Sequence, residues 1–207
     1  MTIEDLTTYT EVDPNNKLSA TTTRASGNSV RRNETCYQYY DKGTDFFNEL
    51  NINFTIRLST SGIEQALGVF GLANNLNHFY ALAATDIFVL FYSPSDNRLY
   101  LNKGGSAGSD YTSAPLNTTY YCTLKRSAGA DSVYLDVYTN SARTTLKDTL
   151  EITGLSGVKW RYIYALASYN TGANASCSGY VENIDIPDIA LSSLSFRRRS
   201  FNSILVR

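Results

Sequence analysis

The sequence contains few of the residue types from which catalytic and metal centres are usually built. His78 is the only histidine among 207 residues, so no second imidazole is available for a metal site, and no Ser/His/Asp set is evident. The three cysteines, Cys36, Cys122 and Cys177, cannot all pair within one chain, and no two lie close enough in sequence for a metal knuckle. We therefore expect neither a metal nor another cofactor.

Two further absences limit the partners of the chain. No apolar run approaches the roughly 18–20 residues that span a bilayer, and the acidic, polar N-terminus MTIEDLTTYTEV shows no signal peptide. The formal net charge is -1, so the folded body offers no electrostatic reason for non-specific binding to nucleic acids. We expect neither a membrane nor a nucleic acid among the partners.

Helical periodicity is also missing, because no stretch of about 11 residues sustains a 3.6-residue apolar repeat. Period two dominates instead, and it is clearest in the segment 120–138, which turns at SAGA. The residues on its apolar face are Tyr120, Cys122, Leu124, Val133, Leu135 and Val137. This alternation is typical of a half-buried antiparallel hairpin, and it places Cys122 in the core.

The same alternation recurs along most of the chain, as in 50–59, where Ile52, Phe54, Ile56 and Leu58 share one face. The other strands that we expect are 8–12, 18–24, 29–32, 35–41, 66–73, 79–84, 86–93, 98–102, 146–153, 161–169 and 177–186. We expect a glycine-rich loop at 104–109.

About a dozen short strands favour two packed sheets over one open sheet. The segments 86–93 and 161–169 are apolar on both faces, which is typical of strands that are covered on both sides. An apolar content of 43% is enough to fill a core. We therefore predict an all-β fold, a jelly-roll β-sandwich of two antiparallel sheets, over residues 1–187.

The character of the chain changes after Pro187. Residues 188–207 form a basic and apolar C-terminal tail, which we treat as a separate extension. Two interpretations stay open: a solvated tail, or a docking segment that contacts an acidic partner through its arginines and buries its apolar residues. The docking residues would be Arg197, Arg198, Arg199, Phe201, Ile204, Leu205 and Val206.

Several segments together resemble a known family. The succession NFTIRLS, YYCTLKRSAGADSVYLDVYTNSARTTLKDTLEITG, WRYIYALASYNTG and SGYVENIDI resembles concanavalin A-like lectin/glucanase jelly rolls, in particular LamG-like modules of uncharacterised phage and environmental sequences. The resemblance covers roughly residues 5–186. It implies the jelly-roll fold, surface recognition, and pairing of the first strand, 8–12, with the last, 179–186. Function does not follow from the fold.

An enzyme of this superfamily would need clustered carboxylates. The glucanases carry two glutamates and an aspartate at alternate positions of one strand, and retaining hydrolysis needs carboxyl groups about 5–5.5 Å apart. The nearest candidates are Glu182, Asp185 and Asp188. Steps of three place Asp185 on the face opposite Glu182, and Pro187 ends the strand before Asp188. We therefore expect no enzymatic activity.

A sugar-binding site would use exposed aromatic rings on a sheet or at loop tips. The candidates are Trp160, Tyr162, Tyr164 and Tyr169, with His78 as a polar supplement. The alternative for each ring is a packing role, which is the main use of aromatic residues on strands.

Taken together, these observations predict a non-enzymatic virion structural protein. We expect a phage capsid decoration or surface protein that docks through protein contacts on a viral capsid or another self-assembling partner. Such a protein reaches the virion surface by cell lysis, without a signal peptide. A homo-oligomer remains open, and the alternative function is a carbohydrate-binding, lectin-like module.

Overall fold

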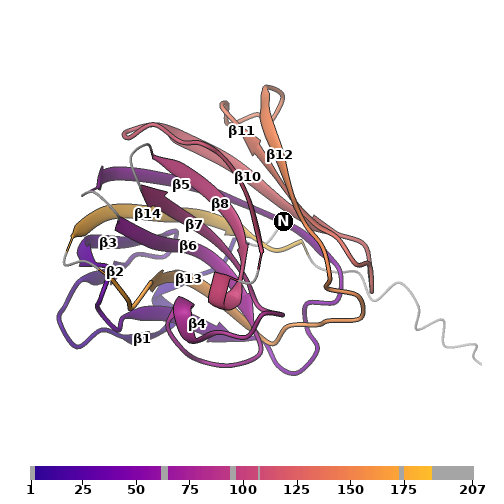
Figure 1. Cartoon of the computed structure of the whole chain (residues 1–207), viewed down its shortest axis with the longest axis horizontal. Coiled ribbons are helices and arrows are strands. Elements are labelled where there is room, and N and C mark those ends of the chain that lie inside the picture. Colours follow the sequence, from indigo (N-terminus) through magenta and orange to yellow (C-terminus); the bar gives the residue numbers. More distant parts are fainter. Residues whose placement is uncertain (1–2, 62–64, 94–96, 107, 173–174, 188–207) are drawn as a thin grey trace, which may run out of the picture.

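The protein is a sandwich of two β-sheets (Figure 1). The computed structural model describes residues 3–61, 65–93, 97–106, 108–172 and 175–187. Fourteen strands lie in these ranges, and every pairing between them is antiparallel. No helix in the described part of the chain is long and apolar enough to cross a membrane. The predicted all-β jelly-roll sandwich is confirmed.

Each sheet has seven strands. Sheet I runs in the order β1 (Thr10–Val12), β4 (Tyr37–Asp41), β13 (Tyr162–Ser168), β6 (Gln65–Ala73), β7 (Ile87–Ser93), β8 (Arg98–Lys103), β9 (Ser109–Ser113). Sheet II runs in the order β12 (Leu146–Ile152), β11 (Val133–Tyr138), β10 (Thr119–Arg126), β5 (Leu50–Ser61), β14 (Ser176–Asp185), β3 (Arg24–Arg31), β2 (Leu18–Ala20). Three short 3-10 segments, η1 (Leu6–Thr8), η2 (Phe79–Ala81) and η3 (Gly104–Ser106), complete the fold.

The main core lies between the two sheets and follows the predicted alternation. On β5 the four predicted inward residues, Ile52, Phe54, Ile56 and Leu58, are all buried. Phe54 stacks on Phe70 of β6 across the interface, with ring centroids 4.3 Å apart. Burial of each such side chain stabilises the fold by about 1.5–3 kcal/mol, so these rings hold the two sheets together.

Four sequence expectations about the elements are wrong. The strands expected at 18–24 and 29–32 are replaced by the short β2 and by one continuous strand, β3. Residues 79–84 form no strand but contain η2, which lies in a loop. The segment 104–109 is not all loop, because β9 begins at Ser109. Strand β1 pairs with β4 in sheet I, whereas β14 pairs with β3 and β5 in sheet II. The chain start still reaches the last strand, since Ile3 forms a bridge with Asp185.

The outer faces of the two sheets differ in chemistry. The outer face of sheet II is a polar network, in which Asp136 of β11 accepts hydrogen bonds from Lys125 and Thr149. The outer face of sheet I carries a second hydrophobic cluster, which is separate from the main core and rich in tyrosine. Aromatic side chains that do not belong to the main core therefore gather on the outer face of sheet I, the aromatic face.

Candidate functional site

A loop formed by residues 74–86 covers the middle of this aromatic face. Asp86 closes the loop at its base, since its carboxylate accepts hydrogen bonds from the backbone N–H groups of Asn74 (2.9 Å) and Ala83 (3.1 Å). Burial raises the pKa of Asp86, and these two hydrogen bonds oppose that rise. Loop 74–86 is thus held at its base by a buried acid.

Tyr164 of β13 fastens the same loop to sheet I. Its hydroxyl accepts a hydrogen bond from the Asn77 N–H (3.0 Å) and donates one to the Asn75 carbonyl (3.1 Å). Phe79 of η2 is fully buried and packs edge-on against Phe88 of β7, with ring centroids 5.5 Å apart. Loop 74–86 is therefore a fixed cover, and it leaves only part of the aromatic face open.

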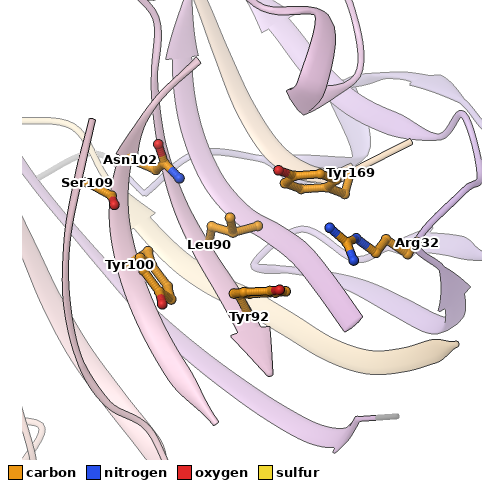
Figure 2. Close-up of a pocket in the computed structure, with 7 residues that line it drawn as sticks. All are labelled: Arg32, Leu90, Tyr92, Tyr100, Asn102, Ser109 and Tyr169. Atoms are coloured by element: carbon orange, nitrogen blue, oxygen red, sulfur yellow. The ribbon is translucent and has the colours of Figure 1, made fainter. Parts of the chain in front are cut away.

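Beside this cover lies a cavity of about 210 Å³, which we call the tyrosine pocket. Its floor comes from β7, β8 and β9 of sheet I, and its wall comes from the residue after β13 and the residue after β3 (Figure 2). The residues that line it are Leu90, Tyr92, Tyr100, Asn102, Ser109, Tyr169 and Arg32. The pocket thus joins segments from both sheets.

The wall of the pocket is built around Arg32. Its guanidinium lies over the ring of Tyr169 (4.7 Å to the centroid) and over the ring of Tyr92 (5.4 Å). Loop 74–86 positions Tyr169 in turn, because the carbonyl of Tyr169 accepts a hydrogen bond from the Tyr80 N–H (3.2 Å). The ring of Tyr169 also packs on Phe79, with centroids 5.2 Å apart. The wall is therefore held from two sides.

The floor combines aromatic rings with polar groups. Tyr92 and Tyr100 lie with ring centroids 6.0 Å apart, and Tyr100 continues toward Tyr111 on β9 at 5.0 Å. Asn102 is 6% exposed, and its Oδ1 has no hydrogen-bond partner within the described residues. Because buried polar atoms are nearly always paired, this amide favours a ligand or a water molecule at the site.

This arrangement suits a small polyhydroxylated ligand. Tyrosine rings can pack against apolar C–H faces, while an amide, a hydroxyl and a guanidinium bind oxygen atoms. The volume is below the roughly 300–1,000 Å³ of pockets for drug-sized ligands, so it fits a single ring or a terminal group. None of the seven lining residues is Asp, Glu, His or Cys.

Of the five ring residues predicted as ligand contacts, the structure brings only Tyr169 to the pocket. Trp160 and Tyr164 are fully buried, and the Trp160 Nε1–H donates to the Thr85 carbonyl (2.8 Å). Tyr162 is half-buried and makes an edge contact with Tyr39, whereas His78 lies in loop 74–86, where burial lowers its pKa.

Sequence reasoning missed the other lining residues. Alternation along β7 and β8 places Tyr92 and Tyr100 on one face of sheet I, so that signal could have identified these two. Arg32 gives no such signal, because it follows β3 of sheet II and reaches the pocket only through the packing of the sandwich.

The C-terminal tail lies outside the described residues. Its predicted docking residues, Arg197, Arg198, Arg199, Phe201, Ile204, Leu205 and Val206, therefore have no structural description. Docking on a viral capsid and location at the virion surface stay predictions of the sequence.

The acids considered for catalysis are remote from the tyrosine pocket. Glu182 and Asp185 lie on β14 of sheet II, and Glu182 pairs with Arg24, whose Nε donates to it at 2.8 Å. Asp188 lies outside the described residues. Neither Glu182 nor Asp185 is among the seven residues that line the pocket.

A calcium ion does not fit the residues of this region. Calcium takes six to eight oxygen ligands, usually including several carboxylates. In the ranges that the structure describes, no three His, Cys, Asp or Glu side chains gather around a common point. Asp86, at the base of loop 74–86, directs both oxygens to backbone N–H groups.

Comparison with protein-family models and with curated protein sequences finds no match. Solved structures resemble the chain in fold. A functionally unknown protein from Saccharomyces cerevisiae has a TM-score of 0.59 and 9% identity over 88% of this chain and 97% of its own. The cellulose-induced protein Cip1 has a TM-score of 0.52 and 9% identity over 90% of this chain and 96% of its own.

Another solved structure with a similar fold is the exoplasmic/lumenal domain of VIP36. Its Ca2+/Man-bound form has a TM-score of 0.51 and 8% identity over 84% of this chain and 82% of its own. These likenesses show the fold alone, and it is the concanavalin A-like jelly roll that the sequence resembles.

Proposed function

We propose that the protein is a non-catalytic, lectin-like module that binds carbohydrate in the tyrosine pocket. The observation that carries the proposal is the composition of this pocket: three tyrosine rings beside an amide, a hydroxyl and a guanidinium. Sugar rings have apolar C–H faces and a rim of hydroxyls, so they can pack on aromatic rings while polar groups fix their orientation.

The fold adds support of a coarser kind. VIP36, which shares the concanavalin A-like fold, has a structure described as Ca2+/Man-bound. At 8% identity the likeness carries no residue of that site to this chain. It supports carbohydrate binding as a class, whereas the pocket of this chain supplies the residues.

The absence of catalysis is part of the proposal. Glycoside hydrolysis needs two carboxyl groups that flank the bond to be broken. The seven lining residues include no carboxylate, and Asp86 nearby is occupied by the backbone of loop 74–86. A bound glycan would therefore be held without being cleaved.

A glycan array with the folded protein tests the proposal, followed by titration calorimetry on the best ligand. We expect the array to show binding, and we expect Tyr92→Ala and Tyr169→Ala to weaken it about tenfold or more, since each removes one stacking surface. Tyr134→Ala is the matched control, because Tyr134 is 37% exposed on β11 of sheet II.

Two outcomes would overturn the proposal. One is a folded protein that binds no glycan on the array. The other is binding that survives in both pocket variants, or that is lost equally in the Tyr134→Ala control.

A further inference from the structure

We infer that the ligand of the tyrosine pocket is an oligosaccharide, and that Tyr111 of β9 binds the sugar unit that follows the one in the pocket. This inference rests on the proposed carbohydrate-binding function and names the class of its ligand. It follows from a row of tyrosine rings that begins in the pocket and continues beyond it, and from the wall that closes the opposite side.

The row of rings crosses three neighbouring strands of sheet I. Tyr92 of β7 and Tyr100 of β8 line the pocket, with ring centroids 6.0 Å apart. Tyr111 of β9 is directly opposite Tyr100 in the strand pairing, and the two ring centroids lie 5.0 Å apart. Tyr111 is not among the residues that line the pocket. The aromatic surface is therefore longer than the pocket, and one sugar ring cannot cover it.

Tyr111 is exposed although its ring is held in place. It is 48% exposed at the surface. The guanidinium of Arg98 packs on its ring, with 4.4 Å from the central carbon to the centroid, and Tyr100 packs on it as well. A side chain that is already ordered loses little conformational entropy when a ligand covers it. Tyr111 is thus a preformed aromatic contact surface beside the pocket.

Polar groups accompany the rings. Asn102 and Ser109 form the next pair on the same face, because each lies two residues along its strand from Tyr100 or Tyr111. Both line the pocket, and Oδ1 of Asn102 has no hydrogen-bond partner within the described residues. A sugar unit that packs on Tyr100 can therefore place hydroxyls at Asn102 and Ser109. This position leaves the ring of Tyr111 for a second unit.

The wall of the pocket sets the direction in which a longer ligand extends. Tyr169 and Arg32 form this wall, and Figure 2 shows them across Leu90 from Tyr100. On the other side, β9 is the outermost strand of sheet I in the described part of the chain, so the row of rings reaches the edge of the sheet. A ligand with one unit in the pocket therefore continues over Tyr111, away from the wall.

Oligosaccharides of increasing length test the inference. The cello-, manno-, xylo- and chito-oligosaccharide series are each titrated with the full chain, from the monosaccharide to the trisaccharide. NMR detects the binding, because it reaches the low affinities expected of monosaccharides. In at least one series we expect the disaccharide or the trisaccharide to bind about tenfold more tightly than the monosaccharide, since the added unit covers Tyr111.

Three variants assign this gain in affinity to one residue. Tyr111→Ala should reduce the gain to about twofold or less and keep the monosaccharide affinity within about threefold, because Tyr111 lies outside the pocket lining. Tyr111→Phe keeps the ring and should keep the gain. Tyr80→Ala is the matched control: Tyr80 is 52% exposed and packs on Tyr169 of the wall, with ring centroids 5.8 Å apart. This variant should leave the gain unchanged.

The outcomes separate this inference from the proposed function. If monosaccharides bind as tightly as the longer chains, or if none of the four series binds while the glycan array shows another ligand, the inference is wrong and the carbohydrate module stands. A gain that persists in Tyr111→Ala, or that Tyr80→Ala removes as well, overturns the role of Tyr111. If no saccharide binds, the proposed function fails, and the inference fails with it.

Discussion

At the scale of single residues, Gly71 shows how closely the aromatic face of sheet I is packed. A Cβ on Gly71 of β6 would lie 2.4 Å from the ring of Phe88, which has no room to move beneath Phe79 and Tyr164. We expect Gly71→Ala to lower the free energy of unfolding by about 1–3 kcal/mol, the usual cost of overpacking. Urea denaturation measures it.

The control for this prediction replaces Phe88, the other residue of the contact, by a smaller side chain. Phe88→Leu in the Gly71→Ala background should recover part of the loss, giving a coupling energy between the two sites. Additive effects of the two substitutions would show that the Gly71–Phe88 contact is not the cause.

At the scale of elements, the alternation of apolar residues predicted the strands well wherever one face was buried. Strands β5, β10 and β11 follow the predicted faces, because their inward residues meet the main core. Strand β9 was not predicted, because its sequence, SDYTS, shows little alternation of apolar residues. The strand predicted at 79–84 is wrong because Phe79 and Leu82 are buried in a loop that lies on top of sheet I. A buried loop can have the same pattern of apolar residues as a buried strand.

Asp86 makes the stability of loop 74–86 testable. Asp86→Ala leaves two N–H groups, those of Asn74 and Ala83, without their acceptor. We therefore expect the free energy of unfolding to fall by at most about 1–3 kcal/mol for each unsatisfied group. Amide hydrogen exchange should speed up at these two positions. Unchanged exchange there would contradict the role of Asp86 as the closure of the loop.

The pH dependence of the same variant has a definite sign. Burial raises the pKa of Asp86, so between its unfolded and folded pKa values the native state binds more protons than the unfolded state. Stability then falls as the pH rises through this window. Asp86→Ala lacks this titration, so the difference in unfolding free energy between wild type and variant should shrink from about pH 3.5 to pH 7. If the difference in unfolding free energy between wild type and Asp86→Ala grew with pH, this prediction would be wrong.

At the scale of the whole molecule, the tyrosine pocket depends on contacts that no local pattern reveals. Tyr92 and Tyr100 come from neighbouring strands of sheet I, Tyr169 follows β13, and Arg32 follows β3 of sheet II. The sequence could predict that two sheets form, but not that the end of one sheet supplies an arginine to the outer face of the other. A pocket of this kind is a property of the packed sandwich.

The same whole-molecule view predicts the effect of removing the C-terminal tail. Strand β14 completes its pairing with β3 and β5 by Asp185, and Ile186 is already buried, so a chain of residues 1–187 contains every strand that the structure describes in the two sheets. We expect its urea unfolding midpoint to match that of the full chain. A lower midpoint would mean that residues 188–207 stabilise the sandwich.

Truncation also tests the docking role that the sequence predicts for Arg197–Arg199 and the apolar residues after them. If the tail docks on a capsid, the full chain should sediment with particles from its source material, and residues 1–187 should stay in the supernatant. Because the truncated chain is expected to keep the tyrosine pocket, its glycan binding should be unchanged. Equal sedimentation of the two chains would contradict docking through the tail, whereas loss of glycan binding on truncation would show that the tail contributes to the pocket.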